Sequence, residues 1–208
     1  MAFIEDGIEL QKAEISENKK TVFLIGDSIR IGYSETVKAE LADVANVIWP
    51  AENCRNSQYI LTTLRTWATI TDPATVDLVL FNCGQWDLAH FEGDAYNLTD
   101  IDTYALNIGR IIWRLHKHFP NAKIHFATCS SMNPDGIIGR NPRTNEEVKA
   151  YNAAACRAVQ KEGVPVCDIF AFTETLSGAD FVDHCHPTKE AFASLGKYVA
   201  AYLRKALV

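Results

Sequence analysis

Short apolar runs alternate along the chain with longer segments in which apolar residues recur at helical spacing. The short runs are rich in β-branched and aromatic residues and are mostly continuous rather than alternating. Runs of this kind are typical of strands that are covered on both faces, as in a parallel sheet. They predict five strands, over Thr21–Ile25, Ala45–Trp49, Val76–Asn82, Ile124–Thr128 and Val164–Asp168.

The segments between these runs carry apolar residues at every third or fourth position, which predicts helices. The longest stripe runs from Ile101 to Phe119, with Asp100 or Asp102 near its start and Pro120 after it. Three further stripes cover Ile60–Trp67 behind a predicted Ser57 cap, Val148–Val159 before Gly163, and Phe192–Tyr202 from about Thr188. This alternation predicts an α/β fold, a three-layer α/β/α sandwich with about five parallel strands and right-handed crossovers.

No internal repeat, low-complexity tract or linker marks a domain boundary. Residues 1–20 fit none of the predicted elements, so we expect an N-terminal surface extension over 1–20 and a single domain over 21–208. The length of 208 residues fits one domain, and 48% apolar with 22% charged residues is near the average of soluble globular proteins. Disordered, collagen-like and coiled-coil chains are therefore excluded.

Charge and hydropathy narrow the expected partners. The net charge of −6 argues against nucleic acid, which requires a basic surface. No apolar run approaches the roughly 20 residues that span a bilayer, and the first residues lack a basic start and an apolar stretch. We therefore expect a cytoplasmic protein with a small-molecule partner and no membrane partner. The sequence does not indicate the oligomeric state.

The six cysteines contain no Cys-x-x-Cys pair. In a reducing compartment they are expected to be free thiols, mostly buried as small apolar groups, and zinc is not expected.

A serine follows the first predicted strand in the sequence Gly26-Asp27-Ser28. On a strand-to-helix turn its hydroxyl is exposed, and backbone N–H groups and the helix dipole favour negative charge there. That environment suits the oxyanion of a tetrahedral intermediate. The alternative is that Ser28 only caps the helix, a position that serine often takes.

A second candidate lies just before the last predicted helix, in Asp183-His184-Cys185-His186-Pro187. A carboxylate three residues before an imidazole can bond Nδ1–H and leave Nε2 free as a base. Asp183 and His186 have this spacing, and His184 does not. The alternatives are a solvated loop or a metal site, although no matching pair of ligands is evident elsewhere. In the predicted topology both candidates meet at one sheet edge, so nucleophile, base and acid would come from opposite ends of the chain.

The sequence Val22–Ile29 (VFLIGDSI) together with Asp-x-x-His-Pro at 183–187 resembles the SGNH, or GDSL, hydrolase superfamily. The resemblance covers roughly residues 21–205. It implies a flavodoxin-like fold and hydrolysis of esters without a metal or cofactor, on acyl lipids, simple esters or acetylated sugars. Ser28 matches the family's nucleophile, His186 its base and Asp183 its acid.

Two positions of the implied oxyanion hole depart from the family pattern. Cys54 stands where the family usually has a glycine whose backbone N–H is a donor, and Trp86 replaces an asparagine whose amide is another. Cys54 could still use its backbone N–H, and Asn82 is a candidate substitute amide. The expected oxyanion donors are therefore the N–H groups of Ser28 and Cys54, with Asn82 or Trp86 as the third.

Two residues are candidates for the substrate pocket. Arg30 follows the nucleophile by two residues and would neutralise an anionic substrate group, unless it forms a surface ion pair. Trp86 would stack on a sugar ring or line an acyl pocket, unless it has an ordinary packing role. The loop Cys129–Asn145, which contains Asn133, Arg140 and Arg143, is long enough to shape a pocket, with no single residue assigned.

The sequence thus predicts a serine esterase that hydrolyses a short-chain ester, acetyl first, of a carbohydrate or small alcohol through an acyl-enzyme. The choice rests on polar loops and the lack of an apolar lid segment, and a lysophospholipid or thioester stays open. The alternative class is a catalytically impaired domain that binds carbohydrate or peptide in the same cleft. A nucleotide-binding protein is disfavoured because neither Gly-x-Gly-x-x-Gly nor a P-loop follows any strand.

Overall fold

Five parallel strands form the centre of the structure, a computed structural model that describes residues 13–208. The strands are β1 (Lys20–Ile25), β2 (Ala45–Ile48), β3 (Leu78–Phe81), β4 (Lys123–Ala127) and β5 (Val166–Cys167). They pair in the order β2-β1-β3-β4-β5, which is the flavodoxin-like order. The predicted fold class is confirmed. Residues 1–12 of the expected N-terminal extension lie outside the described residues.

In the described part of the chain, six α-helices and four short 3₁₀ turns connect and cover the strands. The helices are α1 (Ser28–Glu40), α2 (Ser57–Trp67), α3 (Ile101–His118), α4 (Asn145–Lys161), α5 (Ile169–Thr173) and α6 (Lys189–Ala206). The turns are η1 (Ala68–Ile70), η2 (Pro73–Thr75), η3 (Phe91–Gly93) and η4 (Gly178–Asp180). No helix within residues 13–208 is long and apolar enough to cross a bilayer.

Two helices are capped by the residue before the serine that the sequence analysis considered as a cap. Asn56, and not Ser57, caps α2: its side-chain oxygen accepts from the Tyr59 N–H at 2.8 Å. Likewise Asp27, and not Ser28, caps α1. Both serines are the first residues of their helices, which leaves their hydroxyl groups available for other contacts.

The last strand, β5, is shorter than predicted because the residues at both ends of the predicted range bond to neighbouring helices and do not pair with β4. The Val164 N–H bonds to the carbonyl of Val159 at the end of α4, and Asp168 caps α5. Only Val166 and Cys167 pair with β4.

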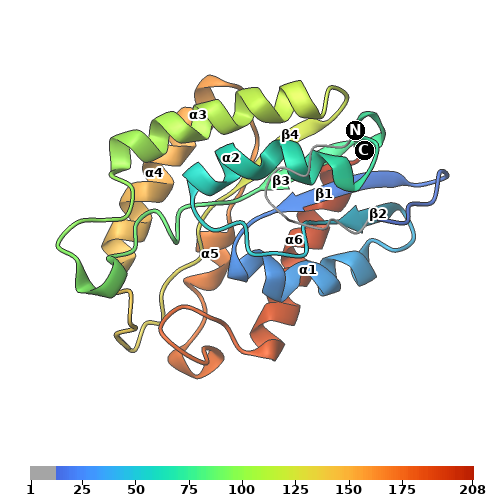
Figure 1. Ribbon diagram of the computed structural model, residues 1–208. Coiled ribbons are helices and arrows are strands. Elements are labelled where there is room, and N and C mark those ends of the chain that lie inside the picture. Colours follow the sequence, from blue (N-terminus) through green and yellow to red (C-terminus); the bar gives the residue numbers. More distant parts are fainter. Residues whose placement is uncertain (1–12) are drawn as a thin grey trace.

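Alternate side chains of the strands build two separate cores. Phe23 and Ile25 of β1 point toward α2, α3 and α4, whereas Val22 and Leu24 pack with α1, α5 and α6. Figure 1 shows α2 and α3 on one side of the sheet and α1 on the other. The strand arrowheads of β1 and β2 point toward the region where the long loops gather (Figure 1). Burial on both faces fixes the register, so the strand ends, and the loops after them, are held in place.

Helices α1 and α6 approach each other closely through glycine. A Cβ on Gly196 of α6 would lie 2.5 Å from Cβ of Thr36 and 3.1 Å from the carbonyl oxygen of Tyr33, both on α1. A Cβ on Gly109 of α3 would meet nothing within 4 Å. An added methyl group should therefore have opposite effects on stability at the two positions: it would collide with α1 at Gly196 and meet no neighbouring atom at Gly109.

We expect Gly196→Ala to lower the free energy of unfolding by about 1–3 kcal/mol, because α1 and α6 must separate. The matched change Gly109→Ala should raise it by about 0.5–1 kcal/mol, because alanine is the better residue in an open helix position. Urea unfolding of both variants measures the difference. A stabilised Gly196→Ala protein would contradict the close packing described here.

Candidate active site

The structure brings Ser28, His186 and Asp183 together as a hydrogen-bonded chain. The Ser28 Oγ lies 2.8 Å from Nε2 of His186, and the His186 Nδ1 lies 2.7 Å from Oδ2 of Asp183. Ser28 comes from the turn after β1, and the other two come from the loop before α6. A hydroxyl, an imidazole and a carboxylate in this order form the arrangement that activates a serine as a nucleophile.

The turn after β1 exposes the serine at a helix terminus. Strand β1 ends at Ile25, and the Asp27 carboxylate accepts from the Ile29 N–H at 3.0 Å, which starts α1 at Ser28. Gly26 is required in this turn, because a Cβ there would lie 2.6 Å from Cβ of Arg30. Within residues 13–208 the Ser28 N–H has no recorded acceptor, and the positive end of the helix dipole lies at the same place.

Asp183 is held as an ionised, oriented acceptor. Its Oδ1 accepts from the backbone N–H groups of Cys185 and His186, both at 2.8 Å, while Oδ2 faces the His186 ring. Burial acts to raise the pKa of Asp183, but these two N–H groups and His186 outweigh it and bring the pKa down to about 2. An ionised Oδ2 requires the proton of the neutral His186 ring on Nδ1, so Nε2 is free to accept the Ser28 proton.

Asn133 fixes the loop that carries the acid and the base. Its backbone N–H donates to the carbonyl of His184 at 2.9 Å, and its side-chain amide donates to the carbonyl of Asp183 at 3.1 Å. Asn133 is buried. The loop Cys129–Asn145 therefore holds the segment with Asp183 and His186 in place through Asn133. The sequence analysis did not assign this role to any residue of the loop.

Two predicted oxyanion donors are engaged elsewhere in the structure. The Cys54 N–H donates to the carbonyl of Gly26 at 3.1 Å, and the Asn82 amide donates to the carbonyls of Ala127 and Thr128 at 2.9 and 3.1 Å. The Cys54 thiol is fully buried, and burial raises its pKa to about 11. Both residues hold neighbouring strand-end loops together, so the structure does not present either donor to the Ser28 hydroxyl.

Arg30 does not reach the cavity. Only 1% of its surface is exposed, and its guanidinium donates to the carbonyl of Gly26 and, at 2.6 Å, to that of Glu52. The expected surface ion pair is also absent among the described residues. Because Arg30 points into the molecule, it ties the nucleophile turn to the loop after β2 instead of facing a substrate.

Another buried polar cluster orients that same loop. The Asp87 carboxylate accepts from the backbone N–H of Ser57 at 3.0 Å and from its hydroxyl at 2.5 Å. Burial raises the pKa of Asp87 to about 6, against the lowering effect of these hydrogen bonds. Asp87 thus anchors the start of α2 to the loop after β3, on which Trp86 lies.

A cavity of about 290 Å³ opens beside the serine. Trp86 is in its wall, half-buried and packed on Phe91 with ring centroids 5.5 Å apart. Within residues 13–208 no acceptor is recorded for its indole N–H, so that donor is available to a bound molecule. The remaining lining residues are Ser28, Ile29, Asn53, Gln85, Arg140, Asn141, Arg143, His184, Cys185 and His186.

Six of these polar residues were not assigned to the site by the sequence analysis: Asn53, Gln85, Arg140, Asn141, Arg143 and His184. Asn53 and Gln85 are adjacent to Cys54 and Trp86, the two positions that depart from the family pattern. Those two departures were the sequence signal that could have identified them. Arg143 and His184 reach the cavity only through the folding of long loops, which no spacing rule describes.

The donor atoms of Asp183, Cys185 and His186 lie within 4.8 Å of one another, as in a possible metal site. However, both oxygens of Asp183 accept hydrogen bonds, and burial raises the pKa of the Cys185 thiol to about 12. A metal ion here would have to displace the contact between Asp183 and His186 and take the proton of the Cys185 thiol. The geometry fits proton transfer from Ser28 to His186, with Asp183 as the ionised partner that orients the imidazole.

We expect Asp183→Asn to lower kcat by a factor on the order of 10⁴ while the protein stays folded. The two backbone donors keep the amide oxygen in the place of Oδ1, so the amide NH₂ faces His186 and forces its proton onto Nε2. Asp180→Asn, three residues earlier, is the control: among residues 13–208 the Asp180 carboxylate accepts hydrogen bonds from Ser177 alone. Kinetics and circular dichroism check both, and a fully active Asp183→Asn enzyme would contradict the role of Asp183.

Comparison with known proteins agrees with this geometry. Residues 24–193 match the GDSL-like Lipase/Acylhydrolase family. No curated protein matches the chain in sequence.

Several solved structures share the fold at low sequence identity. An acetyl xylan esterase is 16% identical with a TM-score of 0.71, covering 88% of this chain and 99% of that one. A lipase/acylhydrolase from Enterococcus faecalis is 19% identical with a TM-score of 0.71, covering 90% and 96%. A carbohydrate acetylesterase from Sinorhizobium meliloti is 16% identical with a TM-score of 0.67, covering 90% and 100%.

Proposed function

Because the chain belongs to the GDSL-like lipase/acylhydrolase family and is an ester-hydrolysing serine hydrolase, we propose that it removes a short acyl group, acetyl first, from a carbohydrate or small alcohol. The observation that carries the proposal is the continuous contact from Ser28 through His186 to Asp183. No step requires a cofactor.

In the proposed reaction the Ser28 Oγ attacks the ester carbonyl while His186 Nε2 takes its proton. The tetrahedral intermediate collapses as His186 returns this proton to the leaving alcohol, and an acyl-serine remains. Water then attacks the acyl-serine with His186 again as the base, and the acid is released. Asp183 stays ionised throughout and stabilises the imidazolium.

The oxyanion of the intermediate is proposed to bind to the Ser28 N–H and to the indole N–H of Trp86. Both residues line the cavity, and neither N–H group has an acceptor among the described residues. This assignment replaces Cys54 and Asn82, whose N–H groups already donate to backbone carbonyls. Loss of one donor of this kind typically costs about 10²–10³ in kcat.

The small size of the cavity supports the short acyl group. A volume of about 290 Å³ is at the lower end of the range found for small-molecule sites, and Asn53, Gln85 and Arg143 are among its walls. Two proteins of similar fold are named as an acetyl xylan esterase and a carbohydrate acetylesterase, which agrees with an acetylated sugar as the substrate.

We expect the wild-type protein to hydrolyse p-nitrophenyl acetate and the Ser28→Ala variant to lose at least about 10³ in kcat, because no nucleophile remains. Ser194→Ala, which removes an exposed hydroxyl on α6, is the control and should keep full activity. Release of p-nitrophenolate measures all three proteins. Equal, slow rates in wild type and Ser28→Ala would contradict the proposal and favour a domain that only binds carbohydrate or peptide in this cleft.

A further inference from the structure

A second, larger cavity adjoins the one beside the serine. Its volume is about 560 Å³, against about 290 Å³ for the first. It is formed mainly by the loop after β4 and the start of α4, and Arg143 and His184 line both cavities. These two residues therefore lie at the boundary between the cavity beside Ser28 and the larger one.

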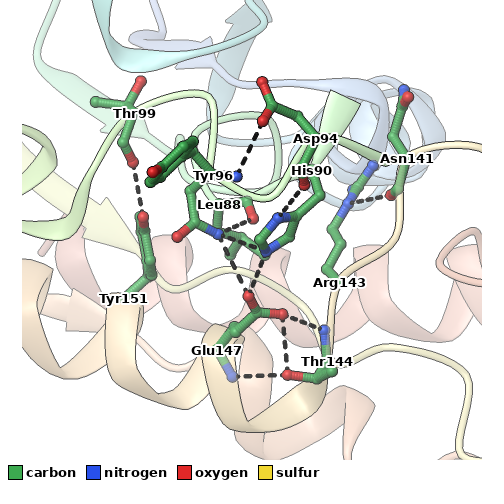
Figure 2. A network of polar contacts seen from close by, with 11 residues as sticks. Leu88, His90, Asp94, Tyr96, Thr99, Asn141, Arg143, Thr144, Glu147 and Tyr151 are labelled. Carbon is green, nitrogen blue, oxygen red and sulfur yellow. Dashed lines mark hydrogen bonds and ion pairs between the residues drawn. The ribbon is translucent and has the colours of Figure 1, made fainter. Parts of the chain in front are cut away.

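Most charges around the two cavities are already paired. His90 Nε2 lies 2.7 Å from Oε1 of Glu147, and its Nδ1 lies 2.8 Å from the carbonyl of Asp94. Figure 2 shows the His90 ring between these two partners, with Thr144 beside Glu147. The Glu147 contact and the Asp94 carbonyl raise the pKa of His90, which favours the charged form of its ring beside the Glu147 carboxylate. Arg140 is likewise paired, with Glu92 at 2.7 Å.

Arg143 differs because its guanidinium is held by neutral groups. Its Nη1 donates to Oε1 of Gln85 at 3.0 Å, and its Nε donates to the carbonyl of Asn141 at 3.3 Å. Within residues 13–208 it has no ion pair, and no acceptor is recorded for its Nη2. Figure 2 shows Arg143 next to Asn141, clear of the contacts between His90 and Glu147.

Gln85 holds the guanidinium of Arg143 in one orientation. Gln85 is buried, and its own amide nitrogen donates to the carbonyl of Ser130 at 2.7 Å. The amide oxygen is thereby directed at the guanidinium. A half-buried guanidinium fixed in this way retains free N–H donors and an unneutralised charge, which is how arginine binds a carboxylate or a related oxyanion.

The neighbouring groups leave Arg143 as the positive charge at this wall. Burial, and the nearby Arg143 charge, lower the pKa of His184, so its ring is neutral at pH 7. The Glu146 carboxylate also lines the larger cavity but not the smaller one. An anionic group is thus favoured at the Arg143 end and disfavoured toward Glu146.

We infer that Arg143 binds an anionic oxygen group on the alcohol part of the substrate, so the enzyme prefers acetyl esters of acidic alcohols. The acyl group then occupies the smaller cavity beside Ser28, and the acidic alcohol extends into the larger one. This inference rests on the proposed esterase function. It makes Arg143, and not Arg30, the residue that determines charge specificity.

Three acetyl esters of similar shape test the inference: 4-acetoxybenzoate, 4-acetoxybenzenesulfonate and the neutral 4-acetoxybenzamide. The quantity measured is the ratio of kcat/KM for each anionic ester to that for the amide, in wild type, Arg143→Gln and Arg143→Lys. Comparison between proteins removes the intrinsic reactivity of each ester, which is the same for all of them. Arg157→Gln, an exposed arginine of α4 outside both cavities, is the control.

We expect the ratio for at least one anionic ester to fall about 10- to 100-fold in Arg143→Gln, the effect of losing one charge-assisted contact, and mainly through KM. Arg143→Lys should keep part of the preference, since it retains the charge without the planar fork. Arg157→Gln should keep the wild-type ratio. The two anionic esters separate a carboxylate site from a sulfate-like one.

An unchanged ratio in Arg143→Gln would overturn the inference, even if both rates fall, because the arginine would then not distinguish charge. Binding of the same compounds to Ser28→Ala by calorimetry separates this result from failure of the esterase function. If wild type hydrolyses none of the esters, the esterase function fails. In that case, tighter binding of an anionic ester than of the amide to Ser28→Ala, lost when Arg143→Gln is added, still supports the anion site. Equal binding of all three compounds overturns it.

Discussion

The contact between Asp183 and His186 is the interaction on which the site depends. It holds the imidazole with Nδ1 toward the carboxylate and Nε2 toward Ser28, 2.7 and 2.8 Å away respectively. The carboxylate can do this because two backbone N–H groups of its own loop keep it ionised and in place. Without that orientation the serine hydroxyl has no base, and the cavity beside it is only a binding site.

The sheet supplies the frame in which this contact forms. Strand β1 lies between β2 and β3, and its register is fixed by burial on both faces, so the turn with Ser28 has one position. The loops around it are then joined by buried polar side chains that donate to backbone carbonyls. Arg30, Asn82 and Asn133 each act in this way. These contacts satisfy backbone groups that would otherwise be buried without partners.

Much of this could be predicted from the sequence, because the relevant signals are local. Strands covered on both faces appear as continuous apolar runs. Asp183 and His186 are three residues apart, a spacing that a single turn of the chain brings into contact. The turn that carries Ser28 could be predicted as well, since it joins an apolar strand to a helix through Gly26. Five strands and a site at the sheet edge follow from these patterns alone.

The residues that could not be predicted are those whose direction depends on tertiary packing. Arg30 follows the nucleophile on a helix, and nothing in the sequence says that its side chain turns inward toward Glu52. Asn82 is similar: an amide at a strand end can face the cleft or the neighbouring strand, and here it bonds to the end of β4. Arg143 reaches the cavity only because Gln85, nearly 60 residues away, is buried beside it.

Covalent labelling with a fluorophosphonate tests the central claim most directly, because it needs no knowledge of the substrate. The reagent forms a phosphorus–oxygen bond with an activated serine and releases fluoride. Intact-mass and peptide analysis of wild type should find one adduct, on Ser28, and the adduct should form far more slowly in His186→Ala. An adduct on another residue, or a labelling rate unaffected by the loss of His186, would contradict the account.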